Sequence, residues 1–479
     1  MRQLLAMKNT SQKTKQYIAI LWIIFLFISL SACQYKGTQK ELGIPKYVFL
    51  FIGDGMGLSQ IHAAEIMQGA LNGEEIDIQK LSFSSFPGTG FMTTFSSNSY
   101  ITDSAAAGTA MASGHKTING RINIDRTNKF EYKTIAEMAK EKGIKIGIIS
   151  NVPLNHATPA CFYARVSHRH QYYEIAQQMV ESGFDFFGGG GIQYPSGRRG
   201  LQADILKLAE QKGYRVIRTK NDFLLLGEEN RNEKIIALNE KLTLKKAMPY
   251  CIDTRDDDLS LADYVNKSIE LIDNDKGFFM MVEGGKIDWA AHDHDAATMI
   301  KEVREFDKAV LRAVQFYNEH PEETLIVVTA DHETGGMTLG SDFTGYSLSL
   351  EILNEQAISL EQFNQEYMRV YDDEIDKREQ RTDDFMPLLQ EKFGLKRILE
   401  KEEKELRNSY EDSKDLLFGL TVVEILNRKA GISWTTGAHT AVPLPVFSCG
   451  KDYEYFVGYY DNTDLFEKLT QVMSLSQSP

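Results

Sequence analysis

Cysteine is scarce in this sequence, with four residues among 479. A small disulfide-stabilised scaffold is excluded, because such folds depend on many closely spaced cysteines. The spacing of Cys33, Cys161, Cys251 and Cys449 also fits no zinc knuckle, which needs pairs of cysteines a few residues apart. The fold must therefore depend on a hydrophobic core. With 42% hydrophobic residues, the chain is long enough to bury a large one, and its length allows two or three domains.

Excess positive charge is also lacking, since the formal net charge is −14. A nucleic-acid-binding protein is therefore not expected, because such proteins present basic surfaces to the phosphates. Internal repeats and low-complexity stretches are absent from the sequence as well. An acidic protein can still bind an anionic substrate where metal ions reverse the sign of the charge locally.

Near the N-terminus stands one apolar run, YIAILWIIFLFISL, which is preceded by Lys8, Lys13 and Lys15 and followed by LSAC. The run is short for a membrane span, which needs roughly 20 apolar residues. A basic start, a short apolar stretch and small residues are typical of a secretory signal, which we place at residues 1–32. A simple membrane-anchor helix is the alternative.

This N-terminal pattern resembles a bacterial lipoprotein signal, in which the cysteine after the small residues receives lipid. The resemblance implies export and a lipid on Cys33, which would anchor the protein to a bacterial membrane on its periplasmic or cell-surface side. Residues 33–44 are polar and would then form a tether. Residues 1–32 contain four bases and no acids, so the mature chain is more acidic than the whole.

From residue 45 onward, apolar runs that end in glycines or polar residues alternate with helical patterns. Strands are predicted in KYVFLFIGDGMG, IKIGIIS, GFDFFGGGG, GFFMMVEGG and TLIVVTADHETGG. Helices are predicted at Tyr172–Ser182, Gln202–Lys212, Leu259–Asp273 and Ala297–Asn318. This alternation predicts one α/β catalytic domain over residues 45–479, with a mainly parallel central sheet and helices on both faces.

Residues 347–430 differ from this pattern, because they are dense in charge at helical spacing. We interpret them as a helical insertion or cap whose faces are mostly solvated. The segments GISWTTGAHT, VPLPVFSCG and YEYFVGYYDN follow, and they are predicted to form strands and turns that complete the main domain.

Polar side chains of the kinds that bind metals gather where the predicted strands end. In open parallel sheets, ligands bind beyond the carboxyl ends of the strands. So many acids and histidines at these ends predict a metal site there. The residues are Asp54, His156, Glu283, Asp288, Asp331 and His332.

Asp288 and His292 are four residues apart, so on a helix they share one face. A carboxylate and an imidazole on one face can hold zinc, with further ligands from elsewhere in the chain. The pair alone also fits an ordinary solvated helix, and the neighbouring Asp293 and His294 compete for the same role.

Asp331 and His332 follow an apolar strand, and because the chain turns there, both side chains can reach one ion. The alternative is a capping acid beside a loop histidine. Asp54 occupies the same position after another strand, where adjacent glycines allow the backbone to approach a ligand closely.

The stretch TDSAAAGTA, residues 102–110, sets one serine among small residues directly after an acid. It fits either an ordinary helix start or a nucleophile placed at a helix N-terminus. In the second case, backbone N–H groups and the partial positive charge of the helix end would favour a phosphate beside Ser104. A serine hydroxyl needs such activation, and a metal ion would add more.

Six motifs, FIGDGMG, TDSAAAGTA, NHATPA, MVEGGKIDWAAH, TADHETGG and TTGAHT, together resemble the alkaline phosphatase family, in matching order. The resemblance extends from about residue 47 to 462, apart from the charged insertion. It implies two zinc ions, one magnesium ion and a phosphoserine intermediate. Small phosphate monoesters would be the substrates, with inorganic phosphate and an alcohol as products, and a homodimer stays open.

By this resemblance, Ser104 is the nucleophile and Arg169 binds the phosphate. Asp54 would bridge the second zinc ion and the magnesium ion. The implied ligands are Asp288, His292 and His439 for the first zinc, Asp54, Asp331 and His332 for the second, and Thr158 and Glu283 with Asp54 for magnesium, where His156 also lies.

His156 stands where some members of the family carry aspartate. A neutral imidazole favours softer ions than a carboxylate does, so the identity of the third metal stays open. Trp289 stands where some members carry lysine or histidine, so one secondary phosphate contact is missing or different.

Other activities fit parts of the same pattern. A related hydrolase of diesters or sulfate esters is the nearest alternative, but Arg169 favours monoesters and the sulfatase pattern Cys-x-Pro-x-Arg is lacking around Ser104. A non-catalytic lipoprotein that binds metal or phosphate, and a metal-dependent phosphomutase, are further alternatives. We interpret FGGGGIQYPSGRRG, residues 187–200, as solvated surface rather than as a wall of the substrate path.

Overall fold

The computed structural model describes residues 43–73, 76–368, 382–413 and 416–475. The predicted signal peptide, Cys33 and nearly all of the predicted tether lie outside these residues. From Ile44 onward the chain forms one compact unit. Among the described helices, none has both the length and the hydropathy that crossing a bilayer requires.

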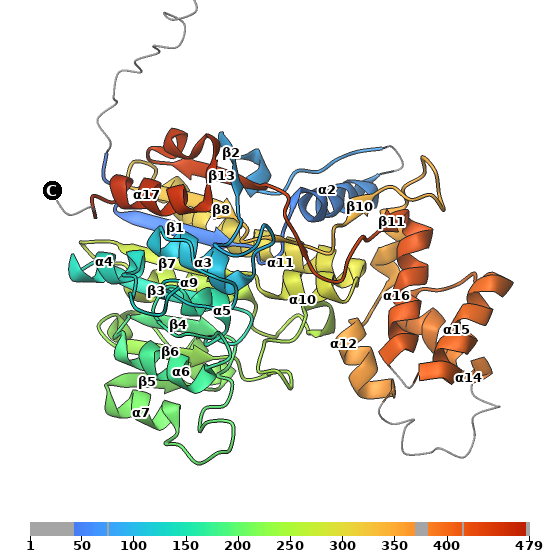
Figure 1. The fold of residues 1–479 in the computed structure, drawn as a ribbon, viewed down its shortest axis with the longest axis horizontal. Helices are drawn as coiled ribbons and strands as arrows, with labels where there is room; N and C mark the ends of the chain where they lie inside the picture. The colour runs from blue at the N-terminus through green and yellow to red at the C-terminus, as the bar shows by residue number, and fades with distance from the viewer. Residues whose placement is uncertain (1–42, 74–75, 369–381, 414–415, 476–479) are drawn as a thin grey trace, which may run out of the picture. The chain divides into compact units, whose positions relative to one another are not determined.

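A ten-stranded sheet forms the centre of this unit, and the predicted α/β class is confirmed. The antiparallel strand β13 pairs with β2 and β8, and every other neighbouring pair is parallel. All five predicted strands are present (Figure 1). In spatial order the strands are β14 (Gly458–Asp461), β2 (Gly88–Thr93), β13 (Leu444–Gly450), β8 (Thr324–Thr329), β1 (Tyr47–Ile52), β7 (Phe278–Glu283), β3 (Lys145–Ser150), β4 (Phe186–Gly189), β6 (Lys234–Leu238) and β5 (Tyr214–Ile217).

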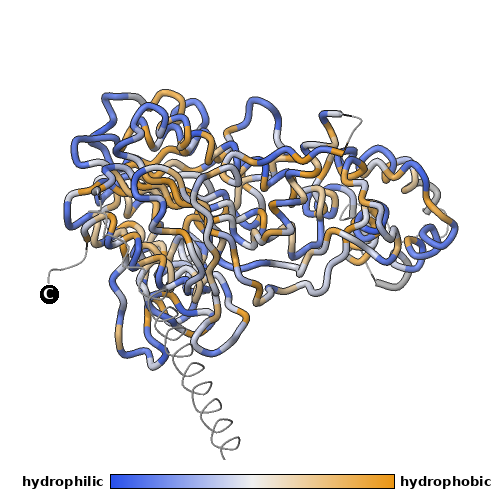
Figure 2. Tube along the Cα trace, turned by 90° about the horizontal axis from the view of Figure 1, so that it is seen from above, coloured by the Kyte–Doolittle hydropathy of each residue, from blue (hydrophilic) through white to orange (hydrophobic). Residues whose placement is uncertain are grey.

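The central strands β8, β1 and β7 are buried at every residue. Their continuous apolar sequences fit a sheet that is covered on both faces, and Figure 2 shows the hydrophobic residues concentrated along them. In the pairing register, Ile52 lies opposite Glu283 on one side and Thr329 on the other, so the three strands end level. The loops that follow them therefore meet at one edge of the sheet.

The four predicted helices are present as α6 (Tyr172–Glu181), α7 (Ile205–Gln211), α9 (Leu261–Ile272) and α11 (Ala296–Glu319). Helix α9 begins at a reciprocal cap in which Ser260 and Asp263 bond each other's backbone N–H. Helices α2 (Leu58–Asn72), α9 and α11 pack together. A second group contains α3 (Ser104–Ser113), α4 (Ile135–Glu141), α5 (Ala157–Ala160) and α17 (Asn462–Val472) (Figure 1).

The charged segment after residue 347 is helical, but it buries more than its sequence pattern predicts. Helix α16 buries Val422, Val423, Ile425 and Leu426, so the segment has an apolar core of its own. It also joins the main body, where the Leu360 N–H donates to Asp295 at 2.9 Å. Its elements are η4 (Leu350–Glu355), α12 (Leu360–Phe363), η5 (Asn364–Met368), α14 (Thr382–Phe393), α15 (Glu400–Ser413) and α16 (Leu416–Ala430).

Several elements had no clear sequence pattern, among them β2, β5 and β6. Two short strands, at Ile432–Ser433 and His439–Thr440, lie in GISWTTGAHT, a segment predicted to form strands and turns. One short pairing matters for function, because it places His439 opposite Thr334. The remaining elements are α8 (Lys220–Leu224), α10 (Lys286–His292), β9 (Glu333–Thr334), β10 (Thr338–Leu339), β11 (Ile432–Ser433), β12 (His439–Thr440), η1 (Phe83–Ser85), η2 (Glu228–Asn230), η3 (Cys251–Asp253) and η7 (Tyr453–Phe456).

Helix α3 is buried along its whole length and consists almost entirely of small residues. At Gly108 a Cβ atom would lie 2.7 Å from the Cys161 sulfur and 3.0 Å from the Cys161 Cβ. Small side chains therefore allow α3 to lie close to the start of the neighbouring segment after α5. This close packing fixes the position of Ser104, the first residue of the helix.

We expect Gly108→Ala to destabilise the protein. In a helix interior, alanine is normally more stable than glycine by about 0.5–1 kcal/mol. Overpacking a tight contact, however, costs about 1–3 kcal/mol. Urea unfolding should show a lower free energy of unfolding, and Cys161→Ala in the same chain should recover part of the loss by removing the sulfur. A Gly108→Ala variant as stable as the parent would show that the contact with Cys161 is not restrictive.

Candidate active site

The loops after four parallel strands and the N-terminus of α3 meet at the carboxyl edge of the sheet. Asp54 follows β1 by two residues, Asp331 follows β8 by two residues, and Glu283 is the last residue of β7. Because these strands end level, the three carboxylates are brought close together. His156 comes from the loop between β3 and α5 at the same edge.

Ser104 begins α3 and is almost fully buried, with 2% of its surface exposed. The preceding Asp103 caps the helix, because its carboxylate accepts the N–H of Ala106 at 3.0 Å. The Ser104 Oγ lies 3.2 Å from the Nε2 of His332. The hydroxyl is thus held at the positive end of a ten-residue helix, a position that favours phosphate binding.

Asp288, His292 and His439 form the first cluster of potential metal ligands. The two histidine Nε2 atoms are 3.1 Å apart, and they lie 3.4 Å and 3.8 Å from Asp288 Oδ1. Each ring is oriented through its other nitrogen, which lies 2.8 Å from a carbonyl oxygen, that of Gly437 for His292 and that of Thr102 for His439. Such outer contacts fix ring orientation in metal sites.

Asp54, Asp331 and His332 form the second cluster, and all three side chains are fully buried. The Nε2 of His332 lies 3.4 Å from Asp54 and 3.3 Å from Asp331. The Gly55 N–H donates to the other oxygen of Asp331 at 3.2 Å. Because Ser104 is next to the same His332 nitrogen, its hydroxyl belongs to this cluster.

Asp54, His156 and Glu283 form the third cluster, in which one ligand atom of each lies within 4.8 Å of the others. Asp54 is therefore shared between the second and third clusters. The Ser150 hydroxyl donates to one oxygen of Glu283, while the other oxygen faces the cluster without a hydrogen-bond partner. The buried Thr158 hydroxyl also lies beside Glu283. The structure thus brings every predicted site residue into one region.

Several oxygen and nitrogen atoms that could bind a metal are buried in these clusters. They have no hydrogen-bond partner among the described residues, although buried polar groups are nearly always paired. A metal ion would satisfy them, and mixed carboxylate, imidazole and hydroxyl donors fit divalent ions. The atoms are both carboxylate oxygens of Asp54, His156 Nδ1, Thr158 Oγ1, Glu283 Oε1 and Asp331 Oδ2.

Burial, followed by repulsion from Asp331 and Asp288, raises the pKa of Asp54 far above its usual range. Burial is also the main cause that raises the pKa of Glu283 and of Asp331. It lowers the pKa of His332, so that imidazole is neutral, the form that binds metals. Bound cations would offset the cost of keeping the carboxylates ionised.

Arg169 is held beside the helix start by Asp103, with Nη1 2.9 Å from the carboxylate. Its Nη2 lies 3.2 Å from His156 Nε2. Burial lowers the pKa of Arg169, but the charge and hydrogen bond of Asp103, together with the charges of Asp54 and Tyr172, outweigh burial and raise the pKa. Asp103 also accepts the Gly120 N–H at 3.0 Å, so the guanidinium is anchored next to Ser104.

Sequence reasoning missed residues that support the ligands from behind. Thr334 donates to Asp288 at 2.5 Å and lies 3.2 Å from His332 Nδ1, so it links the first two clusters. Thr334 belongs to the motif TADHETGG, but no local signal shows where its hydroxyl points. Asp103 could have been found, because an acid directly before a helix start is a capping signal. Asp293 and His294 lie outside the three clusters.

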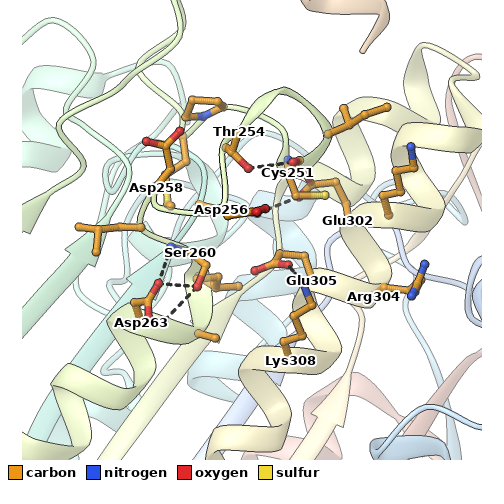
Figure 3. Close-up of a pocket in the computed structure, with 18 of the residues that line it drawn as sticks. Cys251, Thr254, Asp256, Asp258, Ser260, Asp263, Glu302, Arg304, Glu305 and Lys308 are labelled. Carbon is orange, nitrogen blue, oxygen red and sulfur yellow. Dashed lines mark hydrogen bonds and ion pairs between the residues drawn. The ribbon is translucent and has the colours of Figure 1, made fainter. Parts of the chain in front are cut away.

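A large cavity lies away from these clusters. It has a volume of about 590 Å³, lies between α11 and the segment 248–263, and contains none of the site residues (Figure 3). Its charged side chains make local contacts, such as Glu305 with Lys308 at 2.8 Å and the Asp263 cap on Ser260. A smaller cavity of about 250 Å³ borders the clusters through His156 and His292.

Known proteins are similar to this chain over nearly its whole length. A family model described as alkaline phosphatase matches residues 45–475. Alkaline phosphatase 3 of Bacillus subtilis (strain 168) is 31% identical over 461 residues, covering 91% of this chain and 90% of the relative. The alkaline phosphatase of Schizosaccharomyces pombe is 29% identical, with 96% and 87% covered.

Solved structures agree with these sequence matches. The cold-active alkaline phosphatase from the psychrophile Shewanella sp. has a TM-score of 0.77 at 30% identity, covering 89% of this chain and 99% of the other. The alkaline phosphatase from the Antarctic bacterium TAB5 has a TM-score of 0.65 at 28% identity, with 91% and 100% covered. The chain therefore belongs to the alkaline phosphatase family and is a metal-dependent phosphomonoester hydrolase.

Proposed function

We propose that this phosphomonoesterase works through a covalent phosphoserine on Ser104. The observation that carries the proposal is the position of the Ser104 hydroxyl, at the start of a buried helix and 3.2 Å from a histidine of the metal-ligand clusters. A phosphate placed there would contact the N-terminal end of α3 and the guanidinium of Arg169.

We assign the three clusters to three divalent ions. Asp288, His292 and His439 would hold one zinc ion, and Asp54, Asp331 and His332 a second, because mixed imidazole and carboxylate sets suit zinc. When bound, these ions supply Lewis acidity and positive charge at the attacking and leaving oxygens. The third ion, which we assign as magnesium, would be held by Asp54, Glu283, Thr158 and His156.

The chain's own groups carry the reaction as follows. The Ser104 oxygen attacks phosphorus in line with the leaving alcohol, so that a serine oxygen–phosphorus bond forms as the ester bond breaks. The serine proton passes to solvent, and the leaving oxygen takes a proton to become the free alcohol. Water then attacks the phosphoserine from the vacated side, which releases inorganic phosphate and restores the Ser104 hydroxyl.

Arg169 would bind two equatorial phosphate oxygens, where negative charge develops in phosphoryl transfer. Asp103 holds the guanidinium in place and keeps its charge near the helix start. With three divalent ions and Arg169 set against four carboxylates, the pocket is net positive inside an acidic protein, which suits a phosphate dianion.

Ser104→Ala should lower kcat by about 10³-fold or more, because the covalent route is lost. Mass spectrometry of acid-quenched wild-type enzyme should find one phosphoryl group on the peptide with Ser104, and none in the variant. The matched control is Ser113→Ala at the other end of α3, whose hydroxyl bonds the Thr109 carbonyl and should leave turnover intact. Full activity in the Ser104 variant would refute the covalent route.

His156→Asp should make the third cluster prefer magnesium, because an all-oxygen donor set suits this hard ion. After chelation and restoration of zinc, the variant should reach half-maximal activity at about tenfold lower Mg²⁺ than the wild type. The control is His62→Asp, which changes a partly exposed histidine outside the three clusters. Two TAB5 alkaline phosphatase mutants, with histidine replaced by glutamate or aspartate, were solved with Mg in a site called M3. An unchanged Mg²⁺ requirement would contradict the assignment of His156.

We further propose export and lipid attachment at Cys33, on the sequence pattern of residues 1–33 alone. In a bacterial host, the full-length protein should sediment with membranes, and mass spectrometry should find lipid on Cys33. The Cys33→Ser variant should lose the lipid, because the thiol is the site of attachment, whereas Cys449→Ser should keep it. Lipid-free protein from wild-type cells would overturn this proposal.

A further inference from the structure

Two cavities adjoin beside the phosphate site. The smaller, of about 250 Å³, touches His156 and His292 and is also lined by Trp289 and Lys245. The larger, of about 410 Å³, is lined by residues 170–174 and by parts of the segment 194–202. Tyr172 lines both, so the two cavities meet at this residue. The segment interpreted from its sequence as plain solvated surface contributes Tyr194, Arg198 and Arg199 to the larger cavity.

A buried side chain fixes both walls to the active site. Asn155 is fully buried and directly precedes His156. Its amide donates to the carbonyls of Tyr172 at 2.9 Å and Gln193 at 3.0 Å, and its oxygen accepts the Gln193 N–H at 2.9 Å. The Gln193 side chain in turn donates to the Lys245 carbonyl at 3.0 Å. The walls therefore keep a defined position relative to the catalytic cluster.

Two tyrosines form the aromatic part of the larger cavity. The ring centroids of Tyr172 and Tyr194 are 5.8 Å apart. Tyr194 has a φ of +50° and leaves 44% of its surface exposed. A bulky residue rarely adopts this left-handed backbone, and solvation alone gives no reason to place a tyrosine there. The Tyr194 side chain is partly exposed and lines the larger cavity.

Positive charges accompany these rings. Arg198 lies over the Tyr194 ring at 5.4 Å from its centroid, and Lys245 lies 5.1 Å from the centroid of the Trp289 ring. Arg199 also lines the larger cavity, whereas Asp293 and Glu174 are the acids of the two linings. The rings fit an aromatic part of a ligand, and the cations favour the approach of a substrate that carries a phosphate. We name this surface the aromatic–cationic groove (Tyr172, Tyr194, Arg198, Lys245 and Trp289).

We propose that the aromatic–cationic groove binds the alcohol part of the substrate, and that nucleoside monophosphates are the preferred substrate class. The proposal rests on the proposed function, since it places the phosphate at Ser104. The sugar would occupy the smaller cavity, and the base would stack on Tyr172 and Tyr194 in the larger one. A base stacked on an aromatic side chain gains about tenfold or more in binding.

The test compares the specificity constants kcat/KM for adenosine 5′-monophosphate and glycerol 3-phosphate. Wild type should prefer the nucleotide, and the double variant Tyr172→Leu/Tyr194→Leu should lower the ratio of the two constants about tenfold, because leucine keeps bulk but cannot stack. The ratio cancels any loss of folded enzyme. The control, Tyr459→Leu, removes an exposed tyrosine on β14 and should leave the ratio unchanged.

Adenosine provides a second readout, since it occupies the groove without a phosphate. It should inhibit glycerol phosphate hydrolysis competitively in wild type, about tenfold more weakly in the double variant, and ribose should not inhibit. If wild type and double variant have the same ratio of kcat/KM values, the proposal that the groove binds the base is overturned. The proposed catalysis by Ser104 would be unaffected by that result. The ring of O-phosphotyrosine would lie in the smaller cavity, so the double variant should change its kcat/KM little. If kcat/KM for O-phosphotyrosine falls as much as that for the nucleotide, the nucleotide assignment is overturned.

Discussion

Repulsion among buried carboxylates is the constraint on which the active site depends. Asp54, Glu283 and Asp331 are fully buried, and the Asp54 carboxylate lies within 4.8 Å of both others. In water these groups would separate, but here the level ends of β1, β7 and β8 hold them together, at a cost that the large sheet core can offset. Cations relieve this repulsion, so the same geometry that strains the metal-free pocket gives it affinity for divalent ions.

The nucleophile is positioned by packing rather than by polar contacts alone. Helix α3 can reach the carboxylate cluster because its residues are small enough to bury the whole helix. Asp103 then serves two purposes, since it caps this helix and anchors Arg169. One short segment thus brings together the Ser104 oxygen, the helix end and Arg169. In the proposed mechanism these groups would act together on the phosphate.

Two other parts of the chain surround the metal-ligand clusters. Helix α10 carries Asp288 and His292, and it also meets the helical segment after residue 347, where the fully buried Lys286 lies 3.5 Å from Glu361. On the other side, Asn155 fixes the aromatic–cationic groove to the loop of His156. The ligands can therefore keep one geometry, while under the proposed groove the loops around them would select the alcohol.

The sequence by itself determined the fold class, the main strands and helices and, through six ordered motifs, the family and the predicted site residues. Local periodicity and motif order carry that information. Only the tertiary structure decided that His439 pairs opposite Thr334, that Thr334 bonds Asp288, and that Asn155, beside His156, bonds the Gln193 carbonyl next to Tyr194. These contacts join residues far apart in the chain, and neither hydrophobic period nor spacing records which distant side chains will meet.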